Sequence, residues 1–206
     1  MGNFKINRQD LFFILKEQLN YSSLCSLDRY KEIDEKMMDM VVTEAISVAT
    51  GIVDPLQEIG EESPPRLENG KVICPPEFRE AFKHFGEDGW VAISRDLEYG
   101  GQGFPRVVGS VVSDLMYGAC QGYNMAPSLT HGAAHLIESF AKEEFKKLYV
   151  PRMYGGDWAG TMCLTEPDSG SDLSGTQTTA YREGDHFKIK GSKIFISWGD
   201  HDLARI

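Results

Sequence analysis

The run of small polar residues from Thr165 to Asp172 is the stretch whose residue types could hold a ligand. Apolar residues precede it, Pro167 fixes the backbone, and Gly170 removes a side chain from the middle of the turn. Hydroxyl and backbone N–H groups at Thr165 and Ser171 suit a polar or anionic ligand group. The spacing alone leaves two interpretations open, a ligand-binding corner at the end of a strand or a plain surface loop.

Helices are expected to position this loop from its N-terminal side. Apolar residues recur at three- and four-residue steps over residues 28–51, 105–121 and 128–140, and a further helix is expected over residues 142–153. The region between residues 60 and 76 is rich in Pro and Gly and is predicted to be a loop. The side chains expected inside the helical core include Met37, Met40, Ala45, Val48, Val108, Val111, Val112, Leu115, Ala119, Leu136, Phe140, Phe145, Leu148 and Tyr149.

After residue 157 the apolar pattern changes to an alternation with period two. Strands are predicted over residues 158–165, 177–182, 186–190 and 193–197. The turn Glu183-Gly184-Asp185 indicates a hairpin between the second and third of them. Helices followed by strands predict an α+β fold. Because under fifty residues of strand would leave open sheet edges, we expect the 206 residues to be the front portion of a longer protein.

The charge and hydropathy of the chain argue against several classes of partner. Lys and Arg number 21 and Asp and Glu 31, which gives a formal charge of −10 and makes nucleic acid a poor default partner. No apolar run approaches the roughly 20 residues of a membrane span. The start of the chain lacks a secretory apolar region, and the four cysteines are spaced as free thiols. These features predict a cytoplasmic protein.

Two other chemistries, metal binding and serine hydrolysis, have less support in the sequence. His131 and His135 have the i, i+4 spacing of metal ligands on one helix face, but no third ligand is apparent nearby, and ordinary helix histidines are favoured. We therefore expect no metal site. Ser169, Ser171 and Ser174 do not form a nucleophile-elbow motif, which argues against a serine hydrolase.

Three motifs resemble those of the acyl-CoA dehydrogenase family and occur along the chain in the order in which that family has them. Residues 164–172 are similar to its L-T-E-P-x-x-G-S-D signature, residues 193–197 to its second flavin segment, and residues 99–103 to the Y-G-G-x-G of its helical domain. The leading segment and residues 195–203 resemble a larger subgroup with an N-terminal extension, which includes 3-methylthiopropionyl-CoA dehydrogenase-like enzymes.

The resemblance implies a division of the chain into three parts. Residues 1–27 would be the N-terminal extension, residues 28–157 the N-terminal all-α domain, and residues 158–206 the first strands of a β-barrel-like middle domain. In the family FAD lies between the middle domain and a C-terminal four-helix domain. A base removes the α-proton of an acyl-CoA thioester and hydride passes to the flavin. Electrons then go to an electron-transferring flavoprotein, and the enzymes are homodimers or homotetramers.

By position in these motifs, the residues implied to contact FAD are Met162, Leu164, Thr165, Gly170, Ser171, Phe195 and Ser197. Ser171 is also implied to contact the acyl-CoA substrate. Where this chain has Phe195 the family often has Trp, so an aromatic surface is kept and the indole N–H is lost.

The resemblance assigns no catalytic base to this chain. The family's catalytic Glu belongs to the C-terminal domain, beyond Ile206, and we expect the 206 residues alone to be inactive and to bind FAD weakly or not at all. The alternative is a non-catalytic or DNA-binding flavoprotein of the same fold, of the alkylation-response type.

Overall fold

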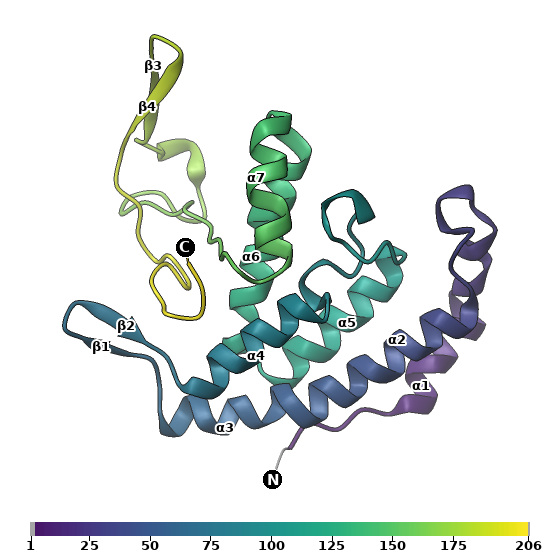
Figure 1. Ribbon diagram of the computed structural model, residues 1–206. Coiled ribbons are helices and arrows are strands. Elements are labelled where there is room, and N and C mark those ends of the chain that lie inside the picture. Colours follow the sequence, from purple (N-terminus) through teal and green to yellow (C-terminus); the bar gives the residue numbers. More distant parts are fainter. Residues whose placement is uncertain (1–2, 206) are drawn as a thin grey trace.

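Most of the computed structural model, which describes residues 3–205, is helical, with one small hairpin between two of the helices and another after the last helix (Figure 1). The α-helices are α1 (Arg8–Phe13), α2 (Glu35–Val48), α3 (Asp54–Glu62), α4 (Pro76–Glu87), α5 (Arg106–Ala119), α6 (Gln121–Phe140) and α7 (Glu143–Tyr154). Two antiparallel hairpins pair β1 (Arg66–Glu68) with β2 (Lys71–Ile73) and β3 (Thr179–Glu183) with β4 (His186–Lys190). The predicted α+β order is confirmed, whereas the barrel-like continuation of the strands stays a prediction.

Helices α2 and α3 form one nearly continuous rod along an edge of the helical part (Figure 1). Asp34 caps the start of α2, because its side chain accepts a hydrogen bond of 2.7 Å from the backbone N–H of Met37. Where the helix predicted over residues 28–51 should end, a π-helical turn, Ala49–Val53, leads directly into α3.

The buried face of α2 agrees with the prediction at Ala45 and Val48 but not at the two methionines. Met38 and Val42 are fully buried, whereas Met37 and Met40 are 41% and 62% exposed. Neighbouring helical positions are rotated by about 100°, so the face that packs on α5 turns both expected core methionines toward solvent.

The hairpin of α6 and α7 projects beyond the other helices (Figure 1). Its base is buried through Val150, Met153 and Tyr154. The side chains near its tip were predicted to lie in the core, but they are exposed because no described element covers that end. The exposed residues are Leu136, Phe140, Phe145, Leu148 and Tyr149. Helix α6 also begins seven residues before its predicted start and contains Pro127.

The region after α7 contains fewer regular strands than predicted. The predicted hairpin is confirmed as β3 and β4, but residues 158–165 and 193–197 are not regular strands. The two segments lie side by side and are joined by a few hydrogen bonds. Ile194 N donates to Thr165 O at 2.9 Å, and Thr161 Oγ1 donates to Ser197 O at 2.5 Å. So few bonds do not make a ladder.

The predicted loop of residues 60–76 also contains structure. Asn69 and Gly70, both at positive φ, form the tight turn between β1 and β2, a pairing that favours this turn type. The end of α3 supplies the first residues of the region.

The last described residues dock on the helical part through specific contacts. Trp198 Nε1 donates a 3.1 Å hydrogen bond to Gly122 O at the start of α6. The Asp202 carboxylate accepts bonds from Cys74 N at 2.8 Å and from Arg79 Nη1 at 2.5 Å. These contacts join residues more than 70 positions apart and place the extended segment against α4 and α6.

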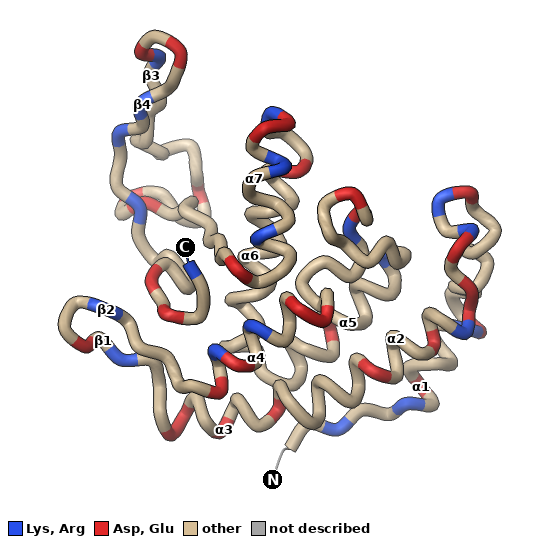
Figure 2. Tube along the Cα trace, in the orientation of Figure 1, with Lys and Arg blue, Asp and Glu red and all other residues tan. Residues whose placement is uncertain are grey.

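Charges of both signs are interspersed along the trace (Figure 2). All four cysteines are free thiols, as predicted. Among residues 3–205, no helix combines the length and apolar character that crossing a membrane requires.

Candidate functional site

The buried carboxylate of Glu166 organises the polar loop after residue 164. Its oxygen atoms accept hydrogen bonds from Gln177 N at 2.6 Å and Thr178 N at 3.0 Å, and Lys193 Nζ lies 2.8 Å away. The hydrogen bond from Lys193, followed by those from residues 177 and 178, lowers the pKa of Glu166 to about 2. Lys193 also donates to Leu164 O at 2.9 Å. The charged Glu166 therefore holds three segments of chain together. We call the ion pair of Glu166 and Lys193, with the hydrogen bonds that these two side chains make, the Glu166 clamp.

A tight turn follows this clamp. Glu166 and Ser169 exchange two backbone hydrogen bonds, of 2.9 and 3.1 Å. The buried Ser169 hydroxyl donates to Asp172 O at 2.9 Å, and the Asp172 carboxylate accepts from Ser174 N at 2.9 Å. That last bond holds the pKa of Asp172 below its usual value. The turn is thus fixed from inside, and Gly170 and Ser171 are left exposed.

The surface at Gly170 is open to an approaching group. A Cβ atom added at this glycine would meet only Thr165 Cγ2, at 4.0 Å. Thr165 is half-buried beside it, and its carbonyl is already engaged by Ile194 N. Backbone without a side chain, next to two hydroxyl-bearing residues, suits close contact with a polar ring edge or an anion.

Exposed apolar side chains lie next to this turn. Met162 and Leu164, at alternate positions, are 60% and 44% exposed, and Phe195 is 84% exposed. Phe195 also has a φ of +56°, a left-handed conformation that is unfavourable for a bulky residue. An unfavourable backbone that presents an aromatic ring to solvent is the kind of feature found at ligand sites.

The seven residues predicted to contact FAD occupy two adjacent segments and one turn. Residues 162–165 and 195–197 lie side by side, while Gly170 and Ser171 lie on the turn that Glu166 fastens beside them. An apolar surface flanked by hydroxyl groups fits a planar, partly polar ring such as a flavin. Their role as a flavin site stays a prediction. The sequence reasoning missed the clamp by Glu166 and Lys193, because a pair 27 positions apart has no local signature.

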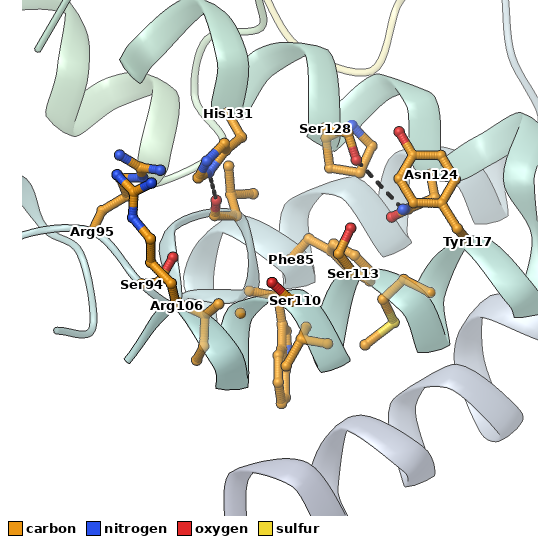
Figure 3. Close-up of a pocket in the computed structure, with 17 residues that line it drawn as sticks. Phe85, Ser94, Arg95, Arg106, Ser110, Ser113, Tyr117, Asn124, Ser128 and His131 are labelled. Carbon is orange, nitrogen blue, oxygen red and sulfur yellow. Dashed lines mark hydrogen bonds between the residues drawn. The ribbon is translucent and has the colours of Figure 1, made fainter. Parts of the chain in front are cut away.

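A second candidate site is a cavity of about 540 Å³ between α5 and α6 (Figure 3). Its lining includes apolar side chains, among them Ile93 and Met116, together with four serines. The lining serines are Ser94, Ser110, Ser113 and Ser128. The 3.2 Å bond from Gly160 N to Thr130 Oγ1 ties the chain that leads to the polar loop onto α6, beside this cavity.

The two histidines of α6 each have a protein partner. His131 Nδ1 lies 2.7 Å from Val91 O, and burial lowers the pKa of His131. His135 Nδ1 accepts a hydrogen bond of 2.7 Å from Arg95 Nη1. In the described part of the chain no three His, Cys, Asp or Glu side chains gather as metal ligands.

Comparisons with known proteins agree with the motifs. Residues 61–157 match the family model described as the acyl-CoA dehydrogenase N-terminal domain. A 3-methylmercaptopropionyl-CoA dehydrogenase of Ruegeria pomeroyi is 34% identical over 197 residues, which are 95% of this chain and 34% of that protein. The chain spans about a third of the length of the curated relatives that it matches over almost all of its own length.

Two solved structures resemble this fold. A Bacillus anthracis acyl-CoA dehydrogenase complexed with FAD has a TM-score of 0.61 and 25% identity over 80% of this chain and 27% of that one. A structure described as an electron transferring flavoprotein of Acidaminococcus fermentans has a TM-score of 0.64 and 28% identity. The match covers 77% of this chain and 39% of that one.

Proposed function

Because the chain is a member of the acyl-CoA dehydrogenase family, we propose that it forms the N-terminal part of an FAD-dependent enzyme. The proposed reaction removes hydrogen from the α and β carbons of an acyl-CoA thioester. The family match over the helical domain and the FAD named in a similar solved structure support this function.

We propose that the surface of Met162, Leu164, Thr165 and Phe195 holds FAD, together with the open turn at Gly170 and Ser171 and with Ser197. FAD, when bound, supplies the hydride acceptor. The Thr165 hydroxyl and neighbouring N–H groups would donate hydrogen bonds where negative charge develops. The exposed apolar side chains would exclude water from the ring, and Ser171 would also contact the substrate.

The proposal extends to domains and partners. Residues 1–27 would form an extension, 28–157 the helical domain, and 158–206 the beginning of a β-barrel-like middle domain. A catalytic carboxylate would come from outside these residues, so the chain alone is expected to be inactive. We also propose a homodimer or homotetramer that passes electrons to an electron-transferring flavoprotein.

The observation that carries the flavin proposal is Phe195, which is 84% exposed and adopts a φ of +56° beside the open turn. Millimolar FAD should shift the amide NMR signals of residues 162–171 and 195–197, with weak affinity. Phe195→Ala should reduce these shifts, whereas Phe187→Ala, at an exposed position on β4, should leave them unchanged. Shifts confined to another surface would contradict the proposed site, and the absence of any shift would contradict binding of FAD by these residues alone.

A second measurement tests the expected inactivity. An acyl-CoA added to the chain with excess FAD should not bleach the flavin absorbance, because the base is not among these residues. Bleaching would contradict that part of the proposal and leave the flavin site in place.

A further inference from the structure

The cavity between α5 and α6 has two arginines at one end. Arg95 and Arg106 both line it, and both also line a smaller adjoining cavity of about 80 Å³. Figure 3 draws them at the same end, near Ser94, with Tyr117 and Asn124 at the other. The cavity therefore has a cationic end and a neutral polar end, and its lining also includes apolar side chains such as Val112 and Met116.

The hydrogen-bonding capacity of these two guanidinium groups is not filled. Arg106 makes no ion pair or side-chain hydrogen bond within residues 3–205. The Nε atom of Arg95 is buried and has no partner in the same part of the chain, although its Nη1 bonds to His135. Arginine presents a fork of donors that matches a carboxylate, so both groups suit an anion.

The nearest carboxylates are engaged elsewhere. Asp96 and Glu138 line the smaller cavity. Asp96 forms an ion pair of 2.6 Å with Arg29, and Glu138 accepts a 2.5 Å hydrogen bond from Tyr154. Neither bonds to Arg95 or Arg106 among the described residues, so an incoming anion would not have to displace a carboxylate from either arginine.

The opposite end of the cavity also has a polar group with spare capacity. Asn124 is only 3% exposed, and its Nδ2 makes one long hydrogen bond of 3.4 Å, to Ser128 Oγ. A buried amide normally satisfies more of its donors and acceptors than this. A ligand that reached through the cavity from the arginines to Asn124 could accept a hydrogen bond from the Asn124 amide with an oxygen atom.

We propose that this cavity binds a short hydrocarbon chain that ends in a carboxylate, with the carboxylate held by Arg95 and Arg106. Such a carboxylate has two possible sources. It could be the far end of an acyl thioester, an assignment that rests on the proposed dehydrogenase function and would make the substrate an ω-carboxyacyl-CoA. It could also belong to a free carboxylic acid.

Calorimetric titration of the chain with hexanoate and with hexan-1-ol tests the site without flavin or turnover. We expect hexanoate to bind about tenfold more tightly than the alcohol, because the charge-assisted hydrogen bonds require the carboxylate. Arg106→Gln should remove this difference. Arg182→Gln, on the exposed strand β3, makes the same charge change elsewhere and should leave the difference intact.

Titration with adipyl-CoA and hexanoyl-CoA distinguishes the two sources. A preference for adipyl-CoA that Arg106→Gln abolishes would assign the cavity to the acyl group. Binding of hexanoate without that preference would assign it to a free acid. Equal affinity for hexanoate and hexan-1-ol, or a preference unchanged by Arg106→Gln, would overturn the proposal. Either result would leave the flavin proposal standing, because FAD shifts are measured at other residues.

Discussion

Lys193 Nζ lies 2.8 Å from Glu166 Oε1, and this ion pair joins segments 27 residues apart in the sequence. Lys193 also bonds to Leu164 O, while Glu166 accepts the two N–H groups of residues 177 and 178. The pair thus holds the proposed flavin segments side by side and fixes the base of the open turn. Its contribution to function would be indirect, through positioning.

Glu166→Gln should loosen the loop without unfolding the helices. The glutamine amide lacks the negative charge of the Glu166 carboxylate, so its hydrogen bonds to the three donors should be weaker. The N–H groups of Gln177 and Thr178 should therefore exchange with solvent faster by a factor on the order of ten. Amide hydrogen exchange measures this directly. Asp168→Asn, at an exposed position in the same turn, is the control and should change nothing. Unchanged exchange in the Glu166 variant would show that the clamp is not needed.

The same clamp predicts a specific response to acid. The pKa of Glu166 is lowered to about 2 in the folded chain from an ordinary value of 4.5. Because the pKa is lowered by folding, the ionised Glu166 carboxylate adds to the free energy of unfolding. This contribution is fully present above about pH 4.5 and is lost as the pH falls through about 2. Carbon-13 NMR of the Glu166 carboxyl should show this titration, and Lys193→Gln should raise its midpoint. A midpoint above 4 in the unaltered chain would contradict the contacts described.

Patterns among neighbouring residues predicted the order of helices and strands better than they predicted which face of each helix is buried. The turn at residues 183–185 correctly indicated the β3–β4 hairpin, because turn chemistry is set by adjacent residues. On α2 the expected burial of Ala45 and Val48 is confirmed, whereas that of Met37 and Met40 is wrong. Which face is buried depends on where α5 packs, and that information is distant in the sequence.

The candidate sites show the same limit. The motif residues indicated the polar loop, but its clamp requires Lys193 to approach from another segment. The cavity has no sequence signature, since Arg95 and His135 meet across 40 residues and Arg106 comes from a third element. Residues 193–197 alternate like a strand, yet they have too few backbone partners to form one.

Phe195→Gly should stabilise the fold and weaken flavin binding together. Phe195 has a φ of +56°, and glycine adopts this conformation without the steric cost of a side chain. After allowing for the extra freedom of glycine in the unfolded chain, we expect a gain of about 0.5–1 kcal/mol in the free energy of unfolding. Denaturant titration measures it.

The matched control for this substitution is Phe187→Gly. Phe187 is also exposed but lies in the regular strand β4, where glycine should cost about 0.5–1 kcal/mol. The free energy of unfolding is therefore expected to rise in Phe195→Gly and to fall in Phe187→Gly. Equal losses of stability would mean that the backbone at Phe195 is not strained.

Tyr123 and Tyr154 should respond oppositely to loss of their hydroxyl groups. Both side chains are almost fully buried, but the Tyr123 hydroxyl has no partner within residues 3–205, whereas that of Tyr154 donates to Glu138 at 2.5 Å. Tyr123→Phe removes an unsatisfied polar group and should stabilise the chain by about 1 kcal/mol. Tyr154→Phe leaves Glu138 without its donor and should destabilise it by about 1–2 kcal/mol. Because both changes delete one oxygen atom, the difference between their unfolding free energies isolates the hydrogen bond. A loss of stability in Tyr123→Phe would instead indicate that this hydroxyl has a partner in solution.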